Sequence, residues 1–415
     1  MAVPQPIYDL VLAGGRVCDP ANGVDKACDV AIAGDRIAAL GDSLAAQARR
    51  VLDVTGKIVT PGWVDLHTHV FEWVTTFGLP PDDVGVNSGV TTAVDQGGAG
   101  AYTIPAFKHY IADRARTDIR CFPSINAAGT LRGGLAGPIL HTPDIVDVDL
   151  LVTEAEKHPK LVRGFGEIHG ESGAWSRWGF AVVEQARAAS DRTGLPLYFH
   201  TGELFEVDEA NRPDSRSLLP QVLKIARPGD ILAHVYSAQH DGVLGADERP
   251  SPLLAEAVAS GLLLDIGFGI NFSYATARRM IAAGIWPSII SSDVHGRFDA
   301  MHDDTMLDYS LAGAFARLVA LGMPFGDALA AVTVTPARVL REEAEIGTLA
   351  VGSRADVTVL EERVESWPLY DSQAEVLMAA RRWLPHLVLR AGEPIVPSLR
   401  LLRDVVAIPQ HAAAA

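Results

Sequence analysis

From Pro61 onward, short runs of apolar residues alternate with longer stretches in which apolar residues recur every three or four positions. Such short runs predict buried strands, and the wider spacing predicts amphipathic helices. Strands are predicted at Gly62–Leu66, Val90–Asp95, Ile119–Ile125, Leu161–Ile168, Pro196–His200, Ile231–His234, Leu262–Ile266 and Ile289–Asp293. Helices are predicted between them, for example at Phe180–Thr193 and Tyr274–Ala283. Eight strand–helix units in this order predict an α/β fold of the (β/α)8 TIM-barrel type.

A doubly wound open sheet is the alternative arrangement for alternating strands and helices. Its glycine fingerprint, GxGxxG after the first strand, is absent from the first unit. The glycines after the second strand, Gly97, Gly98 and Gly100, do not have the spacing of that fingerprint. We therefore favour the closed barrel.

The two ends of the chain have a different pattern, in which short strands are separated by turns instead of helices. At the N-terminal end these strands are Tyr8–Leu12, Asp29–Ile32 and Arg36–Leu40, and at the C-terminal end Ile346–Leu349, Ala355–Leu360 and Leu387–Arg390. The two sets need each other to bury an apolar face. The pattern therefore predicts one small β-sandwich domain from residues 1–60 and 346–415, with the barrel, residues 61–345, inserted between them.

The composition is that of an ordinary globular protein, with 48% hydrophobic and 21% charged residues among 415. The net charge of −16 argues against nucleic acid as a partner. We find no signal peptide and no apolar run of the roughly 18 residues that a membrane helix needs. The three cysteines form no CxxC pair or disulfide framework. We expect a cytoplasmic protein with a small-molecule substrate and no membrane partner.

Histidines and an aspartate stand where the predicted barrel strands end. In the stretch PGWVDLHTH, His67 and His69 are two residues apart and so point to the same side of a strand. His200, His234 and Asp293 end the fifth, sixth and eighth strands. A single histidine here is usually structural, and a single aspartate is often a helix cap. Because strand ends converge on one face of a barrel, the combination instead predicts a metal site.

These motifs resemble those of a known family. PGWVDLHTH, the strand-end His200 and His234, and SSDVHG resemble the metal motifs of the amidohydrolase superfamily. The stretches GVTTAVDQGGAGAYTIPAF, LLDIGFGINFSYATARRMIAAGIWPSIISSDVHG and TPARVL…IGTLAVGSRADVTVL resemble its deacetylase and dihydroorotase-like branch. The resemblance covers nearly the whole chain.

The resemblance implies a centre with two divalent metal ions, most simply Zn²⁺, with Mn²⁺, Co²⁺ or Fe²⁺ as alternatives. His67, His69 and Asp293 would hold one ion, and His200 and His234 the second. It also implies a homo-oligomer.

The fourth strand departs from the family pattern, in which a carboxylated lysine commonly bridges the two metals. In KLVRGFGEIHGESG, Lys160 stands at the start of the strand, and Gly166 falls about where that lysine is usual. We expect the adjacent Glu167 to replace the bridge, aimed by a local bulge. The rival carboxylate or imidazole bridges are His169 and Glu171, and a mononuclear site without a bridge is a further alternative.

The leading functional hypothesis is a metal-dependent hydrolase of a small amide or ester, of the N-acyl or O-acyl carboxylate deacylase type. A hydroxide held by the metals would attack the carbonyl, and Asp293 would carry the proton to the leaving group. Tyr236, His295 and Arg297 are candidate substrate contacts. The alternatives are a dihydroorotase- or hydantoinase-like cyclic amidase, then a deaminase, and a non-catalytic metal-binding barrel. A serine hydrolase is disfavoured because no GxSxG elbow precedes a helix.

Overall fold

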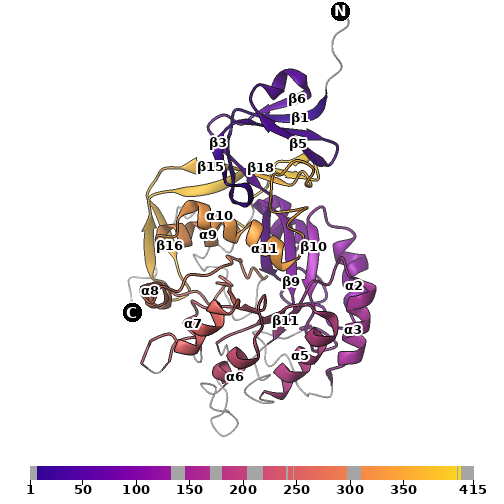
Figure 1. Cartoon of the computed structure of the whole chain (residues 1–415), viewed down its shortest axis with the longest axis vertical. Coiled ribbons are helices and arrows are strands. Elements are labelled where there is room, and N and C mark those ends of the chain that lie inside the picture. Colours follow the sequence, from indigo (N-terminus) through magenta and orange to yellow (C-terminus); the bar gives the residue numbers. More distant parts are fainter. Residues whose placement is uncertain are drawn as a thin grey trace, which may run out of the picture.

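The computed structural model describes residues 7–131, 145–168, 180–202, 218–239, 242–245, 247–296, 310–399 and 401–402. Within them, a barrel ringed by helices lies beneath a β layer built from both ends of the chain (Figure 1). Of the sequence predictions for the site, His169, Glu171 and Arg297 fall outside the described residues. Among the described residues, no helix is long and apolar enough to cross a membrane.

The barrel wall contains two runs of parallel strands. The first run is ordered β10 (Asp118–Phe122), β9 (Val90–Gln96) and β8 (Trp63–Thr68). The second is ordered β11 (Phe165–Ile168), β12 (Leu197–Phe199), β13 (Ile231–Leu232) and β14 (Leu263–Leu264). Seven of the predicted strands are therefore present, most of them shorter than expected.

Single parallel bridges close the barrel between these runs. Cys121 of β10 pairs with Val162, just before β11, and Asp265 after β14 pairs with Ile289. Val294 then pairs with Thr68 of β8. The eighth predicted strand, Ile289–Asp293, thus occupies its place in the wall through isolated bridges only. The (β/α)8 barrel prediction is confirmed.

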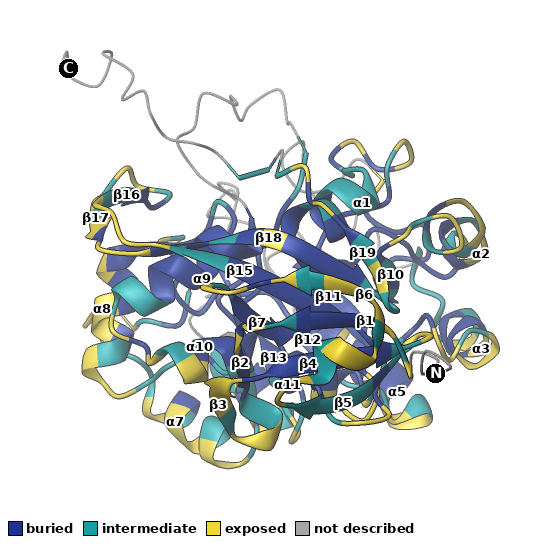
Figure 2. Cartoon of the chain, turned by 90° about the horizontal axis from the view of Figure 1, so that it is seen from above, coloured by how far each residue is buried: buried dark blue, intermediate teal, exposed yellow. Residues whose placement is uncertain are grey.

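The helices turn an apolar face to the barrel. Those described are α1 (Pro81–Val84), α2 (Ile104–Phe107), α3 (Val148–Lys157), α5 (Ala181–Thr193), α6 (Leu218–Ile225), α7 (Pro252–Ala259), α8 (Tyr274–Ala282), α9 (Leu311–Ala320), α10 (Phe325–Ala331) and α11 (Val334–Val339). Short 3₁₀ turns are η1 (Pro20–Asn22), η2 (Leu44–Gln47) and η3 (Val86–Ser88), and η4 (Lys108–Ala112) is a π turn. In α5, Val182, Val183 and Ala186 are buried, whereas Glu184 is exposed. Figure 2 shows buried ribbon at the centre and exposed residues along the outer helices.

Strands from the two chain ends share one six-stranded sheet. Its order is β19 (Glu393–Ile395), β18 (Arg382–Arg390), β15 (Val357–Arg363), β7 (Ile58–Pro61), β2 (Arg16–Asp19) and β3 (Val24–Ala27). A second sheet, β5 (Arg36–Gly41), β4 (Asp29–Ala33), β1 (Tyr8–Ala13) and β6 (Ala48–Asp53), comes from the N-terminal end alone. The strands β16 (Trp367–Tyr370) and β17 (Val376–Ala379) form a separate pair. Because β15 lies between β7 and β18, the two ends complete each other as the sequence predicts.

One predicted strand is wrong. Ile346–Leu349 is buried but forms no strand. The Leu349 N–H donates to the Asp19 carboxylate at 2.8 Å instead of to a neighbouring strand, and Gly347 adopts a left-handed φ of 69°. The apolar side chains were read correctly as buried, but the backbone turns there.

A partly buried ion-pair cluster ties the barrel to the six-stranded sheet. Asp118 of β10 accepts hydrogen bonds from Arg120 and Arg354, each at 2.6 Å, and Arg390 of β18 lies 3.6 Å away. Burial raises the pKa of Asp118, but the three guanidinium groups outweigh it and bring the pKa to about 2. The small β unit is thus held against the barrel by charge as well as by packing.

We expect Asp118 to stabilise the fold at neutral pH and to lose this contribution in acid. An unfolded aspartate has a pKa of about 3.9, so a folded pKa of about 2 corresponds to roughly 2–3 kcal/mol. The folded pKa is the lower one, so the contribution is complete above about pH 5 and fades towards pH 2. Denaturant unfolding of wild type and Asp118→Asn across this range measures it.

The surface carboxylate Asp113, paired with Lys108 and 47% exposed, supplies the control. Asp113→Asn should change the free energy of unfolding by less than about 1 kcal/mol throughout. A stability gap between wild type and Asp118→Asn that stays constant with pH would contradict the assignment.

Candidate metal centre

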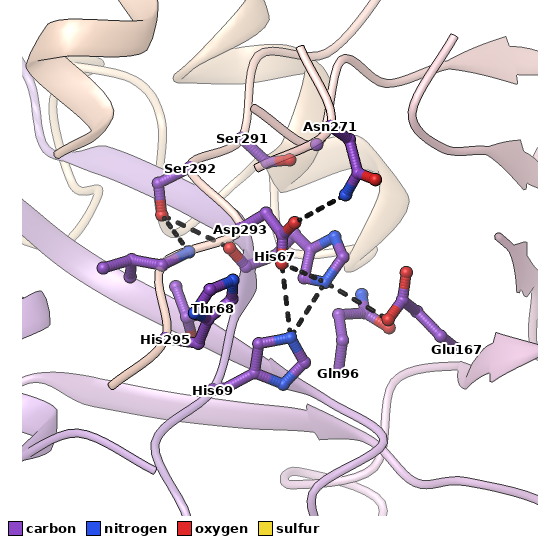
Figure 3. A network of polar contacts seen from close by, with 12 residues as sticks. His67, Thr68, His69, Gln96, Glu167, Asn271, Ser291, Ser292, Asp293 and His295 are labelled. Atoms are coloured by element: carbon purple, nitrogen blue, oxygen red, sulfur yellow. Dashed lines mark hydrogen bonds and ion pairs between the residues drawn. The ribbon is translucent and has the colours of Figure 1, made fainter. Parts of the chain in front are cut away.

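Six buried polar side chains meet at the carboxyl ends of five barrel strands. Each is at most 7% exposed. They are His67 from β8, His69 just after β8, Glu167 from β11, His200 after β12, His234 after β13 and Asp293 from the eighth strand position. The structure therefore brings together all six residues that the sequence predicts as metal ligands. Figure 3 shows four of them, His67, His69, Glu167 and Asp293, facing one another.

The first group is a triangle of potential ligand atoms. His67 Nε2 lies 3.3 Å from His69 Nε2, and Asp293 Oδ1 lies 3.2 Å and 3.3 Å from these two nitrogens. Zinc–nitrogen bonds of about 2.0–2.1 Å place tetrahedral ligand atoms about 3.3 Å apart. The three atoms thus have the separations of three corners of a zinc tetrahedron.

The second group forms around Glu167. Its Oε1 lies 2.6 Å from His200 Nδ1 and 2.8 Å from His234 Nε2. Its Oε2 lies 3.5 Å from His67 Nε2, which belongs to the first group. One carboxylate therefore reaches towards both groups, as a bridging ligand must.

A hydrogen bond behind His234 decides which of its two ring nitrogens carries the proton. His234 Nδ1 lies 2.9 Å from the Gly267 carbonyl oxygen, which only accepts, so the hydrogen is on Nδ1. The neutral ring then presents the Nε2 lone pair to Glu167. A lone pair facing a carboxylate at 2.8 Å is favourable only if positive charge lies between them.

The electrostatics of the centre agree with this demand for positive charge. Burial raises the pKa of Glu167, but His67 and His200 hold it well below its usual range. Burial likewise opposes ionisation of Asp293, and His67 and His69 keep its pKa low. Burial lowers the pKa of His67, yet the Glu167 and Asp293 carboxylates bring it to about 9. Two ionised carboxylates among four imidazoles are a donor set for Zn²⁺ or a similar divalent ion, and the residues fit such a metal.

The backbone departs from regular strand geometry where ligands are aimed inward. The pairing of β11 with β12 shifts register between Phe165 and Ile168, which is the local bulge expected beside Glu167. A side chain at Gly166 would have its Cβ 2.7 Å from Gln96 Oε1 and 2.8 Å from Tyr198 Cβ, so a lysine does not fit there. His234 and Asp293 adopt left-handed φ angles of 58° and 49°, which non-glycine residues rarely do.

The predicted substrate contacts fare differently. The Tyr236 side chain is fully buried, and its hydroxyl donates to the Ile285 carbonyl at 3.0 Å, beyond α8. We therefore do not retain Tyr236 as a substrate contact; the pattern showed its position after His234 but not the packing around its ring. His295 is half-buried, with its ring centroid 6.1 Å from that of His69.

Three residues that the sequence reasoning missed support the centre. Tyr198 contacts His67, Asp265 contacts Tyr198, and Asn271 donates to Asp293 Oδ2 at 3.2 Å. Asp265 follows the apolar run of the seventh strand, so the rule used for the other ligands, a polar residue at a strand end, also points to it. Tyr198 lies inside β12, where an aromatic residue looks like ordinary core.

Comparisons with known proteins agree with this geometry. No family model matches the chain. A deacetylase of Agrobacterium fabrum is 31% identical over 376 residues, which are 89% of this chain and 87% of the relative. A deacetylase of Brucella anthropi is 29% identical, covering 90% of this chain and 89% of its own.

Two solved structures have nearly the same fold. An adenine deaminase, 25% identical, matches with a TM-score of 0.82 over 94% of this chain and 100% of its own. A dihydroorotase, 28% identical, matches with a TM-score of 0.81 over 94% and 99%. Fold and site together define a barrel hydrolase. The chain belongs to the amidohydrolase superfamily, and the curated relatives that it matches over most of its length include three deacetylases.

Proposed function

We propose that this chain is a metal-dependent deacylase that hydrolyses a small N-acyl or O-acyl carboxylate, with two divalent ions, most simply Zn²⁺, at the centre. The observation that carries the proposal is the position of Glu167, whose two oxygens face both groups of histidines. The deacetylase relatives support the choice of reaction.

The bound metals would supply a lowered pKa for water and a polarised substrate carbonyl. His67, His69 and Asp293 would hold one ion, and His200 and His234 the other, with Glu167 between them. All other steps fall to side chains of the chain itself.

Asp293 is the residue placed to move the proton. Its Oδ1 faces the centre, and its Oδ2 accepts the Asn271 amide at 3.2 Å, so the carboxylate is fixed in orientation. Its low pKa keeps it ionised, which is the form that can accept a proton from water at the centre. It would then return this proton to the departing nitrogen or oxygen of the tetrahedral intermediate.

A cyclic amidase is the second candidate, since a dihydroorotase is among the solved structures that match over nearly the whole chain. Ring opening and deacylation share attack on an amide carbonyl, so the same residues serve both reactions. The difference lies in the substrate and not in the centre.

Metal content and a substrate panel test the proposal together. The panel contains N-acetyl and O-acetyl carboxylates, dihydroorotate, a hydantoin and adenine. We expect about two divalent ions per chain by elemental analysis, acetate release as the fastest reaction, and loss of activity on chelation that Zn²⁺ restores. About one ion per chain with ammonia release from adenine would replace the deacylase with a deaminase.

A further inference from the structure

A segment that supplies none of the six ligands touches two of them and reaches a third through Tyr198. Residues 265–271 follow β14 and read DIGFGIN. The Gly267 carbonyl accepts the His234 Nδ1–H at 2.9 Å, and Asn271 Nδ2 donates to Asp293 at 3.2 Å. Asp265 reaches the third ligand, His67, through Tyr198.

Asp265 is the residue of this segment that accepts hydrogen bonds from several neighbouring groups. It is fully buried and accepts the Tyr198 hydroxyl at 2.7 Å on Oδ2. The Ser291 hydroxyl lies 2.8 Å from both of its oxygens, and the Gly267 N–H donates to Oδ1 at 3.1 Å. Each of these donors leaves the carboxylate in the role of acceptor.

This arrangement sets the proton on His67. The Tyr198 hydrogen is used by Asp265, so the Tyr198 oxygen accepts from His67 Nδ1 at 2.9 Å. In the neutral form of His67, which is the form that binds a metal, the ring hydrogen is therefore on Nδ1 and the Nε2 lone pair faces Asp293 and His69. His234 has the same polarity, imposed by the Gly267 carbonyl.

Glycine is required where the segment passes the ligands. A Cβ on Gly267 would lie 2.4 Å from His234 Nδ1, and a Cβ on Gly269 would lie 2.4 Å from Asp293 Oδ2. Their φ angles of 45° and 23° are left-handed. The backbone after β14 is thus packed directly against the ligands and limits their movement.

We propose that Asp265 is a positioning residue for both halves of the metal centre. Through Tyr198 it presents the His67 Nε2 lone pair to the first group, and through Gly267 it holds the carbonyl that orients His234 in the second. The inference rests on the proposed metal dependence and adds residues that make no contact with the metals themselves.

In Asp265→Asn, the donor and acceptor roles are reversed in one of the hydrogen bonds that residue 265 makes with Tyr198 and Gly267. If its amide NH₂ faces Tyr198, the Tyr198 hydroxyl must donate to His67 Nδ1, which moves the ring hydrogen to Nε2 and removes the lone pair. If its amide oxygen faces Tyr198, the NH₂ group opposes the Gly267 N–H, which displaces the Gly267 loop. Either outcome weakens the centre while the side-chain volume is unchanged.

Zinc retention tests the proposal without reference to activity. Zinc-loaded full-length protein is dialysed against chelator-buffered Zn²⁺ over a range of free concentrations, and bound zinc is measured by elemental analysis. The variants are Asp265→Asn and Tyr198→Phe, with Tyr274→Phe as the matched control. Tyr274 is also fully buried, but its hydroxyl donates to the Leu369 carbonyl at 3.1 Å.

Tyr274→Phe should retain zinc as wild type does. In Tyr198→Phe only His67 loses its partner, so one of the two zinc ions should be affected. To keep this ion bound, the free Zn²⁺ concentration should have to be about 10–100-fold higher than for wild type. For Asp265→Asn, both halves should shift by at least this factor. Circular dichroism checks that each variant is folded. If Asp265→Asn does not fold, the zinc-retention curve of Tyr198→Phe is compared with that of Tyr274→Phe, and this comparison tests the proposal.

Retention curves of Tyr198→Phe and Asp265→Asn that coincide with the control would overturn the positioning role. If the wild-type protein binds neither zinc nor any other divalent ion at any concentration, the proposed function itself is overturned. The two failures are therefore distinguishable.

Discussion

Replacing Glu167 by alanine is expected to remove one metal ion from each chain and to lower turnover by more than about 100-fold. Residues that only support metal ligands are worth about 10–100-fold in affinity or activity, and a shared ligand is worth more. The Glu167 carboxylate lies 2.6 Å from His200 Nδ1 and 2.8 Å from His234 Nε2, and it is the counter-charge of these two buried imidazoles. Without it, two buried imidazoles lose their anionic partner.

Elemental analysis and initial rates on the same preparation measure both effects. Glu167→Gln keeps the side-chain volume and removes the charge, so it should behave like Glu167→Ala if charge is what matters. The control is Glu154→Ala in α3, which removes another buried carboxylate, one that pairs with Lys157 on the outer wall. If Glu167→Ala keeps both metals and the full rate, Glu167 is not the bridge.

Replacing Asp293 by asparagine should lower kcat by about 10²–10⁴-fold while the protein stays folded. Asparagine has the same shape and can still accept the Asn271 amide, but it cannot take up a proton at the centre. In the wild type, Asp293 Oδ1 lies 3.2 Å from His67 Nε2 and 3.3 Å from His69 Nε2. Part of the loss can therefore come from weaker metal binding. Rates are therefore measured at saturating Zn²⁺, with bound metal determined in parallel.

Asp371→Asn is the matched control for that variant. Asp371 is 2% exposed and accepts the Tyr274 N–H at 2.8 Å, away from the centre. Its replacement should lower stability and leave kcat unchanged. An Asp293→Asn enzyme with full metal content and wild-type kcat would move the proton transfer to another residue.

The six central residues could be predicted because strand ends converge in a barrel. Each ligand follows an apolar run, so its place on the catalytic face is encoded locally in the sequence. Glu167 was found through a departure from the family pattern, and Gly166 explains that departure, since the Gln96 and Tyr198 side chains leave no room for a Cβ there.

The residues behind the ligands could not be predicted in the same way. Tyr198 is recognised only when β12 is placed beside His67 and Asp265, contacts that span 131 and 67 positions of sequence. The hydrogen bond of the Tyr236 hydroxyl was missed for the same reason, because its acceptor, the Ile285 carbonyl, lies 49 positions away. A local pattern indicates which side a residue faces, whereas its hydrogen-bond partner depends on long-range packing.

During synthesis, the strand β7 is completed long before its partner strand β15. Its Thr60 hydroxyl donates to the Thr358 carbonyl of β15 at 2.9 Å, across 298 positions of sequence. A ribosome that adds about 5–20 residues per second needs about 15–60 s to cover that distance. Until then β7 has an open edge, which is where chains pair wrongly with one another. The yield of native protein therefore depends on how well that nascent edge is shielded while the barrel is still being translated.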